Sequence, residues 1–210
     1  MSNENMTGEV MRSPINDPEQ DSIWVSTSQK GDTAAFNHLV LKWEKNIYNI
    51  ALRMLRDPDE AAEATQEAFF LAFKNIRRFR NDSKFSTWLY RIVLNHCLTC
   101  VRKRPPATHL PIDSPNNETN TIRHLKTTET PDGNLLRLEQ QNIVLAALMH
   151  LPPEQQAVIE LKFFQELTFE EIAVILNTPL STIKSRLYSG LEILKARLGN
   201  GFLAGWREQS

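Results

Sequence analysis

Apolar residues recur every three or four positions along two separate stretches of the chain, which is the period of an amphipathic helix. In the first stretch Phe36, Trp43 and Ile50 belong to such a series, and Asp32 precedes it as the expected N-cap. Asp57-Pro58 then starts a second helix, because Asp favours the cap and Pro the first helical position. Neither stretch alternates as a half-buried strand would. The pattern predicts an all-α fold.

The second stretch ends in a helix-turn-helix pattern. Thr168 and Glu171 have the spacing of a capping box at the start of a short helix, and a turn at 177–180 follows it. Ser181 is the expected cap of a longer last helix, whose apolar stripe continues to Leu198. This order is typical of DNA-binding domains, although plain helical bundles contain the same geometry.

The two stretches are separated by residues 105–134, which are rich in Pro, Asn and Thr and have no sustained apolar period. We therefore expect two small helical domains joined by a flexible linker. The expected limits are a mobile N-terminal tail at 1–20, a first domain at 21–104, the linker at 105–134, a second domain at 135–198 and a C-terminal tail at 199–210.

The overall charge changes this picture little. Lys and Arg number 24 against 25 Asp and Glu, for a net charge of -1, so any nucleic-acid binding must come from local patches. No apolar run reaches the roughly 20 residues of a membrane span, and the first residues lack the apolar centre of a signal peptide. We expect a cytoplasmic protein without membrane insertion of its own.

Cys97 and Cys100 are the only cysteines, and we expect both to be reduced. Together with His96 they supply too few ligands for a typical metal site, and no second cysteine pair exists, so neither a metal nor another cofactor is expected. No nucleophile-base pairing or glycine-rich phosphate loop is present either, which argues against an enzyme. A metal or redox protein built around the two cysteines remains a distant alternative.

The strongest local patch is the segment 74–104, in which nine Lys or Arg meet one acid. A helix expected from about 86 to 102 places Trp88, Arg91 and Asn95 on one side. Arg91 can bind phosphate, Asn95 can bind a base edge and Trp88 can stack on a base, which together suit an unpaired strand. The alternative is that Trp88 belongs to the core and the charges are ordinary surface.

Two further faces carry chemistry. The second helix bears Glu60, Glu63 and Glu67 on its polar side, either as a solvated face or as a docking surface for a basic partner. The last helix turns small hydroxyl residues and two cations away from its apolar stripe, which would let it enter a major groove and reach phosphates.

These segments, in this order, resemble the extracytoplasmic-function sigma factors of bacterial RNA polymerase, within the sigma-70 family. The resemblance runs through 31–40, 57–73, 79–104 and 151–198. It implies a transcription initiation factor that docks on core RNA polymerase, directs it to promoter DNA and is regulated by an anti-sigma factor.

The resemblance also assigns residues. Docking on the polymerase clamp would use Glu60, Glu63, Gln66 and Glu67. Capture of the melted minus-10 strand would use Asn81, Asp82, Ser83, Lys84, Phe85, Trp88, Arg91 and Asn95. Reading of the minus-35 duplex would use Ser181, Thr182, Lys184, Ser185, Arg186 and Ser189.

Some positions depart from the family pattern. Glu166 stands where a glycine is common, so we expect a different local turn, and Gly190 lies inside a last helix poor in Arg, so we expect weaker phosphate binding at minus-35. The main alternative function is a stand-alone helix-turn-helix regulator that binds duplex DNA without polymerase. The sequence favours a sigma factor, because the aromatic and basic helix has no evident role in a sensor domain.

Overall fold

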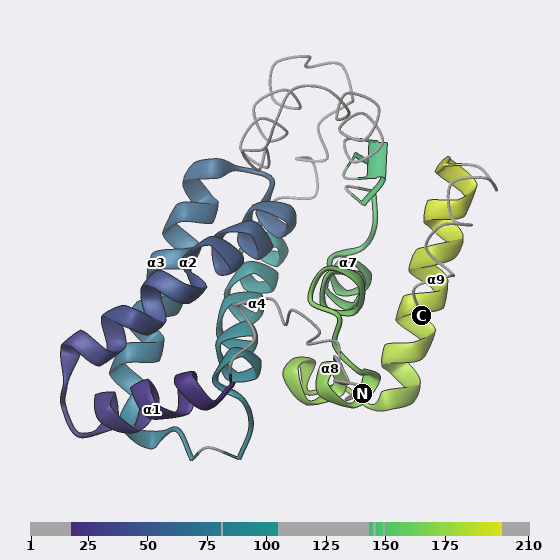
Figure 1. The fold of residues 1–210 in the computed structure, drawn as a ribbon. Coiled ribbons are helices and arrows are strands. Elements are labelled where there is room, and N and C mark those ends of the chain that lie inside the picture. Colours follow the sequence, from purple (N-terminus) through teal and green to yellow (C-terminus); the bar gives the residue numbers. More distant parts are fainter. Residues whose placement is uncertain (1–17, 81, 105–142, 145, 149, 199–210) are drawn as a thin grey trace, which may run out of the picture.

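The computed structural model describes residues 18–80, 82–104, 143–144, 146–148 and 150–198, and all elements within these ranges are helical (Figure 1). This confirms the predicted all-α fold. The elements are α1 Pro18–Gln29, α2 Thr33–Leu55, α3 Pro58–Asn75, a 3-10 turn η1 Ile76–Arg78, α4 Phe85–Lys103, α7 Pro153–Ile159, a wide π-helical segment η3 Glu160–Phe164, α8 Phe169–Leu176 and α9 Leu180–Leu198.

The first domain is built on α2, α3 and α4, whose starts and ends follow the sequence signals. Asp32 accepts hydrogen bonds from the backbone N–H groups of Ala34 and Ala35, and Asp57 caps α3 in the same way. Both predicted caps are confirmed. Between them Arg56 takes a left-handed conformation, with φ of 67°, which turns the chain sharply from α2 into α3.

Helix α1 begins at Pro18, inside the segment that we expected to be a tail. It packs on α2 through buried Val25 and through Asp21, which accepts hydrogen bonds from Lys42 Nζ at 2.7 Å and Trp43 Nε1 at 3.2 Å. A single buried apolar residue gives no periodic stripe, so the apolar pattern could not reveal this helix. The remaining tail residues lie outside the described ranges.

The second domain is formed by α7 with η3, α8 and α9. Thr168 Oγ1 accepts from the Glu171 N–H at 3.2 Å and Glu171 Oε2 accepts from the Thr168 N–H at 3.0 Å, which confirms the capping box. The turn at Asn177, with φ of 47°, then leads into α9. Ser181 is not the cap of α9, because the helix begins one residue earlier and Ser181 lies in its first turn.

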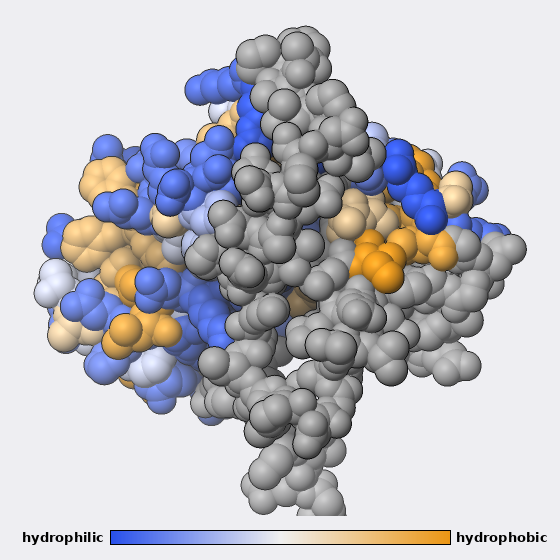
Figure 2. Space-filling model, turned by 90° about the horizontal axis from the view of Figure 1, so that it is seen from above, coloured by the Kyte–Doolittle hydropathy of each residue, from blue (hydrophilic) through white to orange (hydrophobic). Residues whose placement is uncertain are grey.

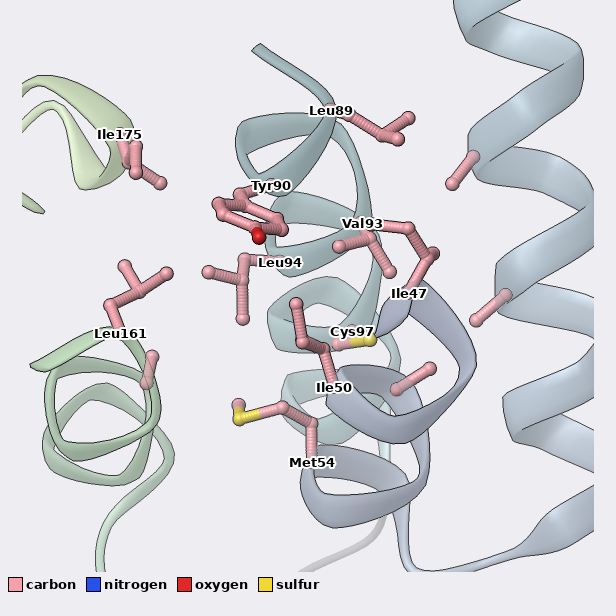
Figure 3. Packing of buried hydrophobic residues seen from close by; sticks show 14 of the residues in the cluster. Ile47, Ile50, Met54, Leu89, Tyr90, Val93, Leu94, Cys97, Leu161 and Ile175 are labelled. Carbon is pink, nitrogen blue, oxygen red and sulfur yellow. The ribbon is translucent and has the colours of Figure 1, made fainter. Parts of the chain in front are cut away.

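The two domains pack against each other, with α4 facing α7 and α8 while α9 lies on the outer side (Figure 1). Tyr90 and Leu94 of α4 and Met54 of α2 approach Leu161 and Ile175 of the second domain (Figure 3). The buried residues therefore form a single apolar cluster across the boundary. The predicted linker at 105–134 and the C-terminal tail at 199–210 lie outside the described residues, and the domain limits stay predictions.

Candidate nucleic-acid interface

The start of α4 carries an aromatic cluster. The Trp88 ring stacks on Phe79, with ring centroids 4.9 Å apart and an interplanar angle of 29°, and Phe85 contacts both. Trp88 is half-buried, whereas Phe85 is only 4% exposed. Phe85 thus supports the tryptophan from the core and offers no ring of its own, although the sequence placed it among the DNA-contacting residues. Part of the Trp88 side chain is accessible to solvent, so Trp88 does not belong wholly to the core.

The polar residues near Trp88 differ in solvent exposure and in their contacts with other side chains. Asn95 is exposed, as are Asp82 and Ser83 in the preceding loop, whereas Asn81 lies outside the described residues. Lys84 Nζ lies 3.4 Å from Glu171 Oε1, and the Arg91 guanidinium donates to the backbone carbonyl of Val174. Both cations of this face therefore contact α8 of the second domain. That contact could not be seen in the sequence.

The acidic side of α3 is open to solvent. Glu63 and Gln66 are exposed and Glu67 is half-buried, while Glu60 forms an ion pair with Arg104 of its own domain. The opposite side packs into the core through Ala61, Ala64, Thr65, Ala68, Phe69 and Ala72. The predicted division into a buried and a solvated side is confirmed.

Two exposed aromatic residues extend this acidic side, and the sequence reasoning missed them. Phe70 is 57% exposed and Phe73 45% exposed. They follow Gln66 at four and seven positions, so the helical period that separates the buried set already places them on the same side. In the space-filling view, apolar surface also lies among hydrophilic residues over the first domain, on the left (Figure 2).

The outer face of α9 carries the residues predicted to read duplex DNA. Ser181, Lys184, Ser185 and Ser189 are exposed, and Thr182 and Arg186 are half-buried. Lys184 Nζ lies 5.6 Å from the centroid of the Phe169 ring, which draws the cation toward α8. Since α9 lies on the side away from α4, this face and the α4 face are separate surfaces (Figure 1).

Gly190 has a packing role at the back of α9. A Cβ built on it would lie 2.9 Å from Ile159 Cδ1 and 3.5 Å from Gln155 Cβ, both on α7. The glycine thus lets the two helices approach closely. At the other departure from the family pattern, Glu166 takes a left-handed conformation with φ of 54°, which is the conformation a glycine would adopt most easily.

Cys97 is buried, Cys100 is half-buried and both are free. Burial raises the pKa of the Cys97 thiol to about 12, which is the wrong direction for a reactive thiolate. Within the described ranges no group of three or more His, Cys, Asp or Glu is placed to hold a metal ion. None of the helices described combines the length and apolar character that crossing a membrane requires.

Comparison with known proteins gives two family matches in the order of the two domains. The family model of Sigma-70 region 2 matches residues 39–105, and that of Sigma-70, region 4 matches residues 141–194. Among solved structures, CnrH in complex with the cytosolic domain of CnrY has a TM-score of 0.62 at 22% identity, covering 85% of this chain and 97% of that one. RpoE of Bartonella quintana, in complex with the anti-sigma factor NepR, has a TM-score of 0.56 at 20% identity, covering 78% and 96%. At these identities the likeness concerns the fold.

Relatives at higher identity carry consistent names. The RNA polymerase sigma-H factor of Pseudomonas aeruginosa is 34% identical over 86% of this chain and 94% of its own length. The ECF RNA polymerase sigma factor SigW of Bacillus subtilis is 36% identical over 81% and 92%, and the sigma-E factor of Escherichia coli is 33% identical over 83% and 92%. The chain therefore belongs to the extracytoplasmic-function sigma factors of the sigma-70 family, which are not enzymes but transcription initiation factors that direct RNA polymerase to promoters.

Proposed function

We propose that the loop at 81–85 and the face of α4 that bears Trp88, Arg91 and Asn95 capture the melted minus-10 strand. The observation that carries this proposal is the half-exposed Trp88, whose ring stacks on Phe79, with the exposed Asn95 two helical turns further along the same side. A pre-positioned aromatic ring can stack on an unpaired base at little entropic cost, and the amide can bond a base edge. In a duplex the base faces are stacked on each other and the pairing edges are bonded to the partner base, so a duplex offers neither contact.

Replacing Asn95 by alanine tests this surface. Loss of a bidentate base contact, about 1–3 kcal/mol, should reduce open-complex formation roughly tenfold to a hundredfold while polymerase binding is kept. The promoter is first identified by transcription from a genomic library with and without the chain. Asn37→Ala, at an exposed asparagine on α2, is the matched control. An unchanged open-complex yield for Asn95→Ala would refute the assignment.

We also propose that the exposed side of α3 docks on the polymerase clamp. Glu63, Gln66 and Glu67 would contact basic groups, and the adjoining Phe70 and Phe73 would add apolar contact area. Glu60 contributes less to this surface than the sequence indicated, because Arg104 already pairs with it. Exposed aromatic residues beside charges are typical anchors of protein interfaces.

Charge reversal tests the docking surface. The double substitution Glu63→Lys and Glu67→Lys should weaken co-elution with core polymerase by more than tenfold, since like charges across an interface repel. Glu44→Lys makes one such charge reversal on the exposed part of α2 and should leave co-elution intact. Full retention by the double variant would show that the acidic side is only a solvated face.

For the minus-35 duplex we propose the outer face of α9, with Ser181, Thr182, Ser185 and Ser189 near base edges and Lys184 and Arg186 near phosphates. With two cations on this face, a shallow dependence of duplex binding on salt is expected. Removal of Lys184 should lower the salt slope by about one unit and weaken all sequences alike. A sequence-selective loss would instead make Lys184 a base-reading residue.

We further propose regulation by an anti-sigma factor and action in the cytoplasm, where polymerase and promoter DNA are found. RpoE of Bartonella quintana, which shares the fold, was solved with the anti-sigma factor NepR. Pull-down of the chain from cells, before and after stress, tests this point. Recovery of polymerase alone under every condition would count against an anti-sigma partner.

A further inference from the structure

A second group of cations lies beside the aromatic cluster, at the end of the first domain where α3 ends and α4 begins. Helix α1 crosses this end of the domain and contacts η1 (Figure 1). The side chains of one lysine and three arginines are exposed there: Lys30, Arg77, Arg78 and Arg80. They come from two segments, the turn between α1 and α2 and the stretch that leads from η1 into the next loop. These four residues form the basic patch.

Direct contacts hold the two segments of the basic patch together. Gln29 Nε2, at the end of α1, donates to the backbone carbonyl of Ile76 at 3.0 Å and to that of Phe79 at 2.7 Å. The turn that follows passes close to η1, since a Cβ built on Gly31 would lie 3.6 Å from Arg77 Nη2. Gly31 has a φ of 101°, a conformation that glycine adopts without strain. Helix α1 and its turn therefore fix where the cations of η1 lie.

The charges of the basic patch are not neutralised by the part of the chain that the structure describes. None of the four cations forms an ion pair with a described carboxylate. Asp32, two positions after Lys30, uses its Oδ1 to cap α2. Grouped like charges repel one another, and they raise the local concentration of anions. The grouping therefore favours a polyanionic partner.

The basic patch is continuous with the aromatic cluster. Phe79 lies between Arg78 and Arg80 in the chain, and its ring stacks on Trp88 with centroids 4.9 Å apart. Ile76 is buried and Phe79 half-buried, so the apolar residues of this stretch face inward while the arginines beside them face solvent. Proteins that hold single strands combine aromatic platforms with cations that follow the backbone. A strand with one base stacked on Trp88 would have its neighbouring phosphates close to these arginines.

We infer that the basic patch binds the phosphates of the unpaired strand next to the bases captured by α4. The inference rests on the proposed role of the α4 face in capturing that strand. Asn95 lies along α4 toward its C-terminal end, whereas the basic patch adjoins Phe79 at the start of α4. The strand therefore runs from Asn95 past Trp88 onto η1 and the turn after α1. The basic patch lengthens the bound segment without reading its sequence, because phosphates carry no sequence information.

Neutralising two arginines tests the basic patch. The probe is a fluorescein-labelled promoter fragment, mismatched over the minus-10 element and the adjoining bases, and the protein is the full chain bound to core polymerase. Arg77→Gln combined with Arg78→Gln should weaken binding roughly tenfold or more. The log-log salt slope should fall by about 1.4 units, because each phosphate contact of a single strand contributes about 0.7. Unchanged affinity and slope would overturn the inference.

A matched pair of lysines controls for the loss of charge alone. Lys30→Ala removes a cation of the basic patch and should lower the salt slope by about 0.7 units. Lys45→Ala removes an exposed lysine from the middle of α2 and should leave the slope unchanged. Equal effects of the two variants would mean that only the net charge of the chain matters, and would overturn the inference. Urea unfolding at the wild-type midpoint confirms that each variant is folded.

Neutral methylphosphonates, placed one at a time in the probe, locate the contact. In the unpaired strand, a methylphosphonate beside the minus-10 element should weaken binding of the wild-type chain. The same change should not weaken the double arginine variant further, because the partner charges are already absent. If this pattern occurred only in the flanking duplex, the assignment to the unpaired strand would be overturned.

Asn95→Ala, measured on the same probe, separates the basic patch from base capture. Weaker binding by the arginine variant alone would overturn base capture and leave the basic patch as a phosphate site. Weaker binding by Asn95→Ala alone would overturn the basic patch and leave base capture standing. Sedimentation with phosphatidylglycerol vesicles tests a different polyanion. Vesicle binding that is lost in the arginine variant, together with unchanged probe binding, would assign the basic patch to a lipid surface and overturn the inference.

Discussion

Replacing Gly190 by alanine should improve helix propensity but worsen packing. The structure predicts that the packing cost is larger, so the variant should be less stable than wild type. The glycine is buried inside α9, where the added methyl would lie 2.9 Å from Ile159 Cδ1. Favourable carbon-carbon contacts lie at about 3.5–4.0 Å, so either the isoleucine or α7 must move. Ile159 is itself fully buried, at 0% exposure, which leaves its methyl group little room.

The magnitude follows from three opposing contributions. Alanine is favoured over glycine inside a helix by about 1 kcal/mol, and burial of one methyl adds about 0.8 kcal/mol. Overpacking a close helix contact costs about 1–3 kcal/mol, and the short contact places this site near the upper end. We therefore expect Gly190→Ala to lower the free energy of unfolding by about 1 kcal/mol.

A double-mutant cycle with Ile159→Val isolates the clash, because valine lacks the Cδ1 atom. Ile159→Val alone should cost about 1 kcal/mol, so additive effects would give about 2 kcal/mol for the double variant. We expect instead that the alanine methyl fills the vacated space and that the double variant lies within about 0.5 kcal/mol of wild type. Urea unfolding followed by circular dichroism at the helix band measures all four proteins.

Two results would refute this reasoning. Stabilisation by Gly190→Ala alone would mean that α9 has room beside α7 and that propensity decides. Strict additivity in the cycle would mean that Ile159 is not the group that resists the new methyl. Either result would also mean that Gly190 does not set the spacing between α7 and α9.

Three smaller predictions follow from local geometry. Glu166→Gly should stabilise the fold by about 0.5–1 kcal/mol, because glycine adopts the left-handed conformation of this position without strain. The midpoint of thermal unfolding should rise accordingly. Asn177→Gly is the control and should change the midpoint less, because asparagine tolerates this conformation. Thr168→Ala should cost about 1 kcal/mol in urea unfolding through loss of the capping box, and no change would contradict it. With its pKa raised to about 12, the Cys97 thiol stays neutral as pH rises past 9, so a thiol reagent at pH 8 should label Cys100 alone in native protein and both cysteines in urea.

Local signals in the sequence predicted most of the helical elements. Asp57 followed by Pro58, and Thr168 followed by Glu171, are caps whose physics lies within four residues, so tertiary contacts did not alter them. Likewise the buried and solvated sides of α3 follow from the helical period alone. The cap predicted at Ser181 was wrong by two positions, because Leu180 already belongs to the helical turn that follows Pro179.

The rest depends on contacts between distant residues. The sequence predicted no role for Glu160 or Gln165, because their partners Arg53 and Tyr90 are 107 and 75 positions away. No local period encodes such a pairing. For the same reason the sequence assigned Lys84 to DNA without its carboxylate partner on α8.

Two of the ion pairs between the domains differ in burial and therefore in strength. Lys84 and Glu171 are 55% and 30% exposed, so their pair contributes about 0–1 kcal/mol and is readily exchanged for a phosphate. The pair of Arg53 and Glu160 is buried, and loss of one partner there costs several times more. Strength therefore resides in groups with no proposed DNA contact, while the DNA-facing cation is only lightly held.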